Sequence, residues 1–272
     1  MTEKEYRAHP AISRSELWRI HESPEKFKWF KDHPPEPTDS LLFGQVVHKL
    51  LLEPDTFSDQ FTVCPNFDRR TKDGKEQFAQ FMSEAVNGRE IVSSETYNLA
   101  IAMVGTCRLD DEVMALLNGA KEQPFFWTDE PTGEECKCRV DCLTDIDGEV
   151  VIIDYKTTAN ASTHKFVRDM YSYGYHFQAG MYCTGVKEAL SLPKLPRFIF
   201  IAQEKKPPYS INRIELPEDV IQLGVDLFRE YIGIYHDCKM TDWWYGYNGP
   251  TSLTNEAYLL EWVKDGEDGD LA

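Results

Sequence analysis

The sequence predicts an α/β fold in which a mixed central β-sheet is flanked by helices and preceded by a helical N-terminal extension. Two runs with strand character flank Asp147-Gly148, a dipeptide that favours a two-residue hairpin turn. A second strand pair is expected at 197–203 and 209–216, across a Lys-Lys-Pro-Pro turn. Apolar residues with helical spacing occur before, between and after these pairs, and this order of elements is typical of a mixed sheet.

The N-terminal part, about residues 9–120, is expected to be helical. Ser13 and Glu16 form a capping box, and Ser23-Pro24 begins the next helix. The segment Ser40–Glu53 is a long apolar helix that ends at Pro54. Further helices are expected over 76–86, 94–108 and 110–117.

The catalytic core is expected over about 124–216, together with the helix that carries His48. A strand at 124–128 leads into the Asp147-Gly148 hairpin, and one helix is expected over 163–186 between the two strand pairs. An amphipathic helix over about 217–236 closes the core.

A two-residue turn at Asp147-Gly148 sets the register of the hairpin. Ile146 then pairs with Glu149, so that Asp141 lies opposite Asp154. Side chains alternate along a strand, which places Asp141, Asp154 and Lys156 on one face and Arg139 opposite Lys156. The other face carries core residues, namely Cys138, Val140, Cys142, Val151 and Ile153.

Opposed carboxylates repel one another across a strand pair, and a divalent cation between them removes the conflict. Mg²⁺ is commonly held by one or two carboxylates together with substrate phosphate oxygens. An Asp…Asp-x-Lys set on one sheet face is therefore typical of metal-assisted phosphodiester hydrolysis. A solvated hairpin face with mixed charges is the alternative interpretation.

Other candidate residues lie outside the hairpin. His48 is either a core histidine or a metal ligand. Gln178 is a polar amide among the aromatic residues of its helix and requires a hydrogen-bonding partner. The densest basic cluster, on the loop between Cys64 and Gln77, is a candidate DNA contact or a solvated loop, and it comprises Arg69, Arg70, Lys72 and Lys75.

The composition limits the class of protein. The chain has 272 residues and a net charge of −17, which disfavours generic nucleic-acid binding but not a nuclease with local positive charge. With a polar N-terminus, no long apolar run and seven cysteines in no disulfide pattern, we expect a cytoplasmic protein with reduced thiols. Residues 1–264 are expected to form one domain and 265–272 a disordered acidic tail.

Four motifs in sequence order resemble those of the PD-(D/E)xK nucleases of the RecB type. They are Gly44-x-x-x-His48, Arg-Val-Asp141, Asp154-Tyr-Lys156 and Gln178-x-x-x-Tyr182. The segments I-S-R-S-E-L, D-R-R-T-K-D-G-K and Y-G-Y-H-F-Q-A-G-M-Y are further similar to the exonuclease VIII (RecE-type) recombination nucleases of phages and prophages.

The resemblance implies a restriction-endonuclease-like core and a set of site residues. The implied metal ligands are His48, Asp141, Asp154 and the backbone carbonyl of Tyr155, with Mg²⁺ as the ion and Mn²⁺ as a substitute. Lys156 is implied to position and activate the attacking water, with Gln178 and Tyr182 in support. No iron–sulfur cluster is expected, because the cysteine pattern of related iron–sulfur nucleases is missing.

The expected function is a bacterial or phage-encoded exonuclease that degrades one strand of duplex DNA for recombination. The resemblance implies action from 5′ ends, a ring-shaped homo-oligomer and service to a single-strand annealing recombinase. An endonuclease of the same superfamily is an alternative. A catalytically silent subunit that binds DNA or a partner is another, although the complete Asp-Asp-Lys set argues against it. No membrane association is expected.

Overall fold

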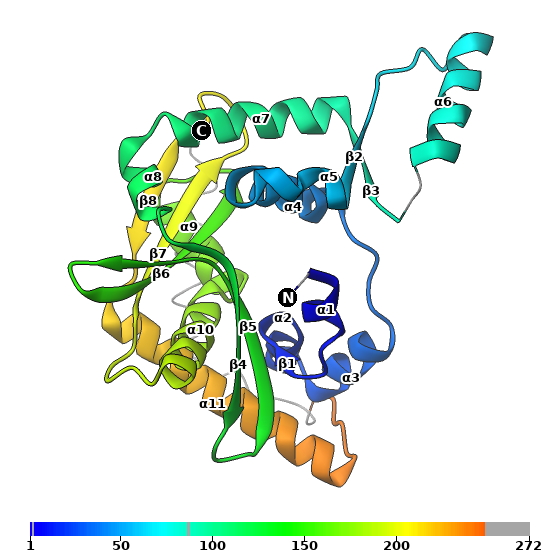
Figure 1. The fold of residues 1–272 in the computed structure, drawn as a ribbon. Helices are drawn as coiled ribbons and strands as arrows, with labels where there is room; N and C mark the ends of the chain where they lie inside the picture. The colour runs from blue at the N-terminus through cyan, green and yellow to red at the C-terminus, as the bar shows by residue number, and fades with distance from the viewer. Residues whose placement is uncertain (2, 86–87, 248–272) are drawn as a thin grey trace, which may run out of the picture.

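A computed structural model gives the structure of the chain and describes residues 1, 3–85 and 88–247. A mixed sheet lies between helices, with a helical region at the N-terminus (Figure 1), and this confirms the predicted fold class. The helices are α1 Glu3–Ala8, α2 Arg14–Leu17, α3 Pro24–Asp32, α4 Asp39–Leu52, α5 Phe57–Gln60, α6 Lys72–Ala85, α7 Ser94–Arg108, α8 Asp111–Leu116, α9 Thr163–Ser172, α10 Tyr175–Leu190 and α11 Glu218–Thr241, with 3-10 turns at Trp18–His21 and Pro54–Thr56. The strands are β1 Ile12–Ser13, β2 Phe61–Cys64, β3 Glu90–Ser93, β4 Ala120–Asp129, β5 Glu134–Ile146, β6 Glu149–Thr158, β7 Arg197–Glu204 and β8 Ile211–Glu215.

The central sheet has the strand order β1-β5-β6-β7-β8, with β4 antiparallel to β5. The β6–β7 pair is parallel, and α9 and α10 form the connection between the two strands. Strands β2 and β3 form a separate parallel pair. The sheet is therefore mixed, as the order of elements predicted.

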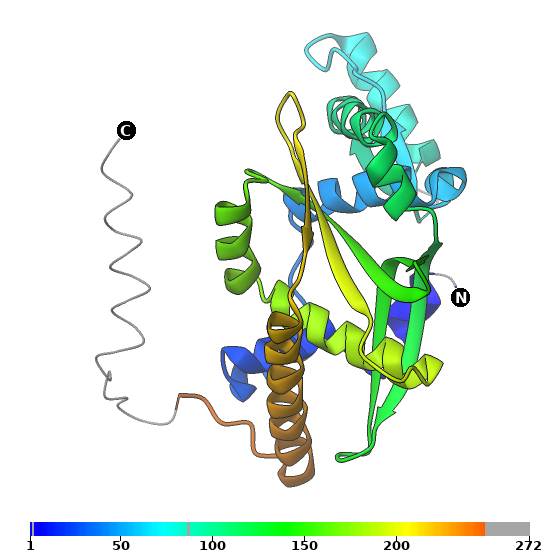
Figure 2. The same ribbon diagram turned by 90° about the vertical axis from the view of Figure 1, so that its left-hand side faces the viewer.

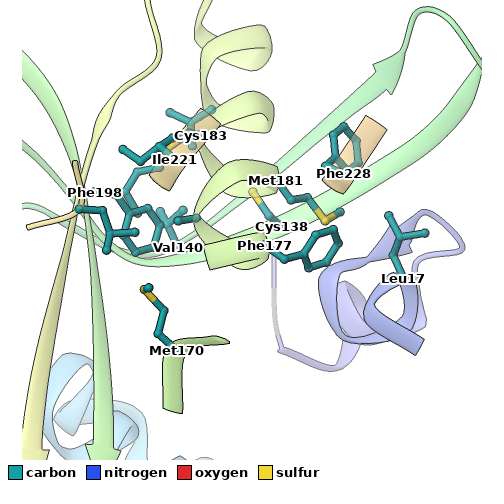
Figure 3. Packing of buried hydrophobic residues seen from close by; sticks show 14 of the residues in the cluster. Leu17, Cys138, Val140, Met170, Phe177, Met181, Cys183, Phe198, Ile221 and Phe228 are labelled. Atoms are coloured by element: carbon teal, nitrogen blue, oxygen red, sulfur yellow. The ribbon is translucent and has the colours of Figure 1, made fainter. Parts of the chain in front are cut away.

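Both faces of the sheet are covered by helices (Figures 1 and 2). On one face, residues of α2, α9, α10 and α11 bury Cys138, Val140, Ile152 and Phe198. Figure 3 shows this packing, with Phe177 and Met181 of α10 beside Cys138. On the other face, residues of α4 and α7 form a second core with residues that include Cys142, Val151 and Ile153.

The predicted hairpin register is confirmed from Cys142 to Glu149. Cys142 pairs with Ile153 and Ile146 with Glu149. Asp147 and Gly148 both have positive φ, 55° and 82°, as a type I′ turn requires.

The prediction that Cys138, Val140 and Cys142 share one face of the sheet is wrong. Cys138 and Val140 lie in the first core, whereas Cys142 lies in the second with Val151 and Ile153. Glu122, on the strand that pairs with β5, has a φ of +48° and interrupts the β4–β5 ladder opposite Asp141. The side-chain alternation therefore changes between Val140 and Cys142.

Several predicted element boundaries also differ. The helix expected over 163–186 is two helices, because Gly174 has a φ of +67° and a Cβ there would lie 2.5 Å from Trp18. The strand expected at 124–128 begins earlier, at Ala120, and strands β1, β2 and β3 were not predicted. The amphipathic helix extends to Thr241.

Within residues 1, 3–85 and 88–247, no helix combines the length and apolar character needed to cross a membrane. The predicted acidic tail at 265–272 lies outside the described residues.

Candidate active site

The candidate site lies where β5 and β6 separate. Along one edge of β5, β1 pairs at Cys136 and Lys137, whereas β6 pairs only from Cys142 onward. Asp141 lies between these two ladders, and its Oδ2 accepts the backbone N–H of Tyr155 at 2.7 Å. A side chain thus takes the place of a backbone partner, and this opens a fork in the sheet.

His48 reaches the fork from α4, a helix capped by Thr38. Its Nε2 lies 2.8 Å from the carbonyl oxygen of Tyr155, and its Nδ1 lies 3.4 Å from Asp141 Oδ2. When Nε2 donates to the carbonyl, the neutral ring keeps its lone pair on Nδ1. That lone pair faces a carboxylate, an arrangement that a cation bound between them would stabilise.

Glu122 completes the cluster from β4. One ligand atom from each of His48, Glu122 and Asp141 lies within 4.8 Å of the other two. Burial and the neighbouring Asp141 carboxylate raise the pKa of Glu122 to about 9. Arg139 approaches the Glu122 carboxylate at 2.6 Å and partly offsets the negative charge.

Asp154 and Lys156 lie on the neighbouring strand as an ion pair. Lys156 Nζ is 2.6 Å from Asp154 Oδ1, and Gln178 of α10 donates to Asp154 Oδ2. Asp154 is only 1% exposed, and burial raises its pKa to about 6 against the lowering effect of Lys156. Burial would lower the pKa of Lys156, but Asp154 and Asp141 outweigh it and raise that pKa.

Tyr182 lies one turn after Gln178 on α10. Burial raises its pKa well above the usual range, and the Asp154 and Asp141 carboxylates raise it further. The structure thus brings together His48, Asp141, Asp154, the Tyr155 carbonyl, Lys156, Gln178 and Tyr182 around one fork of the sheet. Their assigned roles remain predictions.

Glu122 is the site residue that the sequence analysis missed. It lies six residues after the end of α8, in a polar segment that the strand prediction left out. Extending the strand at 124–128 backward by four residues, in the register that pairs Gln123 with Val140, would have placed Glu122 opposite Asp141. The antiparallel register was the one usable signal.

The predicted basic loop does not lie beside His48. Its residues lie around the start of α6, with Arg69 and Arg70 in the preceding turn and Lys72 and Lys75 in the helix. This helix projects from the body of the molecule beyond β2 and β3 (Figure 1). Phe67 packs against the rings of Phe78 and Phe81 on that helix, and the Arg69 guanidinium lies over the ring of Phe78. The role of this loop in DNA binding remains a prediction.

The donor set fits a divalent cation. Two carboxyl groups and an imidazole nitrogen lie close together, and the Asp141 carboxylate raises the pKa of Glu122, so a bound cation could balance the negative charge in place of a proton. Oxygen donors suit Mg²⁺, Mn²⁺ and Ca²⁺, and an imidazole widens the range to other transition metals. The geometry therefore supports a metal site without defining the ion.

Comparisons with known proteins agree with this fold. A protein from Eubacterium rectale, described as a "Putative exonuclease", has a structure that matches with a TM-score of 0.62 at 15% identity, covering 97% of this chain and 98% of that chain. The structure of SSO0001 matches at 16% identity over 70% of this chain and 85% of that chain, with a TM-score of 0.31 that is too low to indicate a shared fold. No match is found among curated proteins. The sequence pattern of the PDDEXK-like domains of unknown function (DUF3799) matches residues 13–256, and this chain therefore belongs to that family.

Proposed function

We propose that this chain is a metal-dependent exodeoxyribonuclease that hydrolyses phosphodiester bonds at the ends of duplex DNA. One observation carries the proposal: the cluster of His48, Glu122 and Asp141 lies at the same fork as the ion pair of the buried Asp154 with the partly buried Lys156. A donor set for a cation beside a partly buried ammonium is suited to a reaction that develops negative charge on a phosphate.

The residues at the fork have separable roles. His48, Glu122 and Asp141 would hold the ion. The Tyr155 carbonyl, another predicted ligand, lies at His48 Nε2, on the side of the ring away from the Nδ1 that faces Asp141. Bound Mg²⁺ would supply Lewis-acid polarisation of the phosphate and a lowered pKa for a coordinated water. Asp154 remains a predicted ligand, although Lys156 and Gln178 occupy its two oxygens in this structure.

Lys156 provides a fixed positive charge at the reacting centre. Its Nζ is held by Asp154 and lies 4.9 Å from the centre of the Tyr175 ring, so the ammonium is oriented before substrate binds. Preorganised charge of this kind stabilises an oxyanion as it develops, because no reorganisation is needed during the reaction. Gln178 in turn fixes the orientation of Asp154.

Mg²⁺ is the proposed ion, with Mn²⁺ as a substitute, because carboxylate oxygens dominate the cluster. Exonucleolytic action is supported by the RecE-type motifs and by the similarity to the Eubacterium rectale protein. Degradation from 5′ ends, a ring-shaped homo-oligomer and an annealing recombinase as partner extend the proposal from the same resemblance. Endonucleolytic cleavage and a silent DNA-binding or partner-binding subunit are the competing functions.

End-labelled DNA separates these functions. We expect a linear duplex to lose label in Mg²⁺ but not in EDTA, and a covalently closed circle to remain intact. Asp154→Asn, which keeps the side-chain volume and removes the charge, should abolish the activity. Nicking of the circle would indicate an endonuclease, and binding of DNA without cleavage in Mg²⁺ or Mn²⁺ would indicate a silent subunit. Separate 5′ and 3′ labels give the direction.

A further inference from the structure

A groove with a volume of about 430 Å³ opens beside Lys156, and apart from Lys156 its lining includes none of the candidate active-site side chains. Its lining includes Lys156 of β6, the pair of Lys205 and Ser40, and two tyrosines at the break between α9 and α10, Tyr173 and Tyr175. A volume of this size lies within the range of pockets that hold small ligands. Because Lys156 lines the groove and is also a residue of the candidate active site, the groove continues directly from that site.

Lys205 is an unusual cation in so acidic a chain. Its Nζ donates to the Ser40 hydroxyl at 2.9 Å and lies 5.8 Å from the centre of the Phe43 ring. Among the described residues, no carboxylate lies within ion-pair distance of this ammonium. Partial burial lowers the pKa of Lys205. A half-buried ammonium without a counter-charge favours the approach of an anion.

The break between α9 and α10 supplies the aromatic wall of the groove. The left-handed backbone at Gly174 places Tyr173 and Tyr175 on either side of the break, with ring centres 5.8 Å apart. Tyr175 packs inward, with Lys156 over its ring, whereas Tyr173 is 57% exposed. An exposed ring beside two ammonium groups can stack a base while the cations contact the adjoining phosphates.

We infer that this groove binds the nucleotide next to the scissile phosphate, with Tyr173 as the stacking platform and Lys205 as the contact to the neighbouring phosphate. The inference rests on the proposed function, since Lys156 is taken to mark the scissile position. Asp169 also lines the groove and accepts a hydrogen bond from the Thr158 hydroxyl at 3.5 Å. Its negative charge disfavours a phosphate in the part of the groove next to it. The phosphate therefore belongs between the two lysines and the base toward Tyr173.

Two substitutions with matched controls test the assignment. Lys205→Ala should flatten the dependence of log K on log salt for a short single-stranded oligonucleotide by about 0.7. Lys206→Ala removes the same charge from an exposed neighbour outside the groove and should leave the slope closer to that of the wild type. Tyr173→Ala should weaken binding about 5- to 150-fold, whereas Tyr173→Phe keeps the ring and should bind like the wild type.

Binding is measured by fluorescence anisotropy in EDTA, so that no hydrolysis is required, and KM and kcat are measured separately in Mg²⁺. In the KM measurement, Lys205→Ala and Tyr173→Ala should raise KM more than they lower kcat. Wild-type hydrolysis with unchanged binding and KM in both variants would overturn the groove and leave the nuclease standing. Loss of binding in both variants without any wild-type hydrolysis would support the groove and overturn the nuclease. Equal effects of Lys205→Ala and Lys206→Ala would overturn the lysine assignment.

Discussion

Replacing Glu122 with Gln tests the residue that the structure adds to the site. The change keeps the volume of the side chain and removes one of the two carboxylates in the cluster. Burial and the nearby Asp141 raise the pKa of Glu122 to about 9, so this carboxyl group is protonated at neutral pH in the metal-free protein, and glutamine replaces it with a side chain that is also neutral. The glutamine oxygen can still accept from Arg139, which Glu122 contacts at 2.6 Å. We therefore expect the metal-free variant to be about as stable as the wild type, or more stable.

The effect of metal should differ more clearly. Loss of an outer-shell partner already lowers metal affinity about 10- to 100-fold, and loss of a direct ligand should lower it by at least as much. That ratio corresponds to about 1.4–2.7 kcal/mol, which at saturating metal is lost from the metal-induced stabilisation. For a chain of this size, we expect the metal-induced rise in Tm to shrink by about 3–10 °C.

Thermal unfolding with EDTA and with increasing Mg²⁺ or Mn²⁺ measures the effect, and Glu53→Gln is the matched control. Glu53 Oε2 also lies near Arg139, at 3.7 Å, but Glu53 is not part of the ligand cluster. The control should therefore keep the full metal-induced shift. A wild-type shift in Glu122→Gln, or an equal loss in both variants, would refute the assignment of Glu122 as a ligand.

Three further predictions concern neighbouring features. Lys156→Ala should lower the single-turnover rate of cleavage of bound DNA about 10²- to 10³-fold, while the metal-induced rise in Tm persists. A variant that loses this rise in Tm but cleaves bound DNA at the normal rate would contradict the assigned role. Gly174→Ala should destabilise the fold by about 1–3 kcal/mol in urea unfolding, because the residue has positive φ and a Cβ would meet a tryptophan ring; unchanged stability would show that the helix break tolerates a side chain. Changing Arg69 and Arg70 together to Ala should flatten the salt dependence of duplex binding by about one to two phosphate contacts, and an identical slope would place the DNA track elsewhere.

Local signals in the sequence were sufficient for much of the fold. The Asp147-Gly148 turn and the alternation after it determined the register from Cys142 to Glu149, because a two-residue turn leaves one pairing. The capping box at Ser13 and the cap at Ser23 marked helix starts that the structure reproduces. These features depend on residues close together in the chain.

The features that were missed depend on distant contacts. Glu122 joins the site only through the pairing of β4 with β5, and its own segment is too polar to be recognised as a strand. A single glycine is tolerated within a helical pattern, so the break at Gly174 becomes evident only once Trp18 packs against it. Cys138 and Cys142 were assigned to one face because regular strand alternation was assumed, and the change of alternation between them depends on the interruption of the β4–β5 ladder at Glu122.

The most direct test of metal-dependent hydrolysis at this fork is a single-turnover Mg²⁺ titration of DNA cleavage by the wild type and Asp141→Asn. The asparagine oxygen can still accept the Tyr155 N–H, so the variant should keep its fold, as circular dichroism can verify. We expect no wild-type cleavage in EDTA, a rate that saturates with Mg²⁺, and a rate for the variant that is lower by about 10³-fold or more at every concentration. Cleavage by the wild type in EDTA, or a variant that cleaves at the wild-type rate, would contradict the assignment.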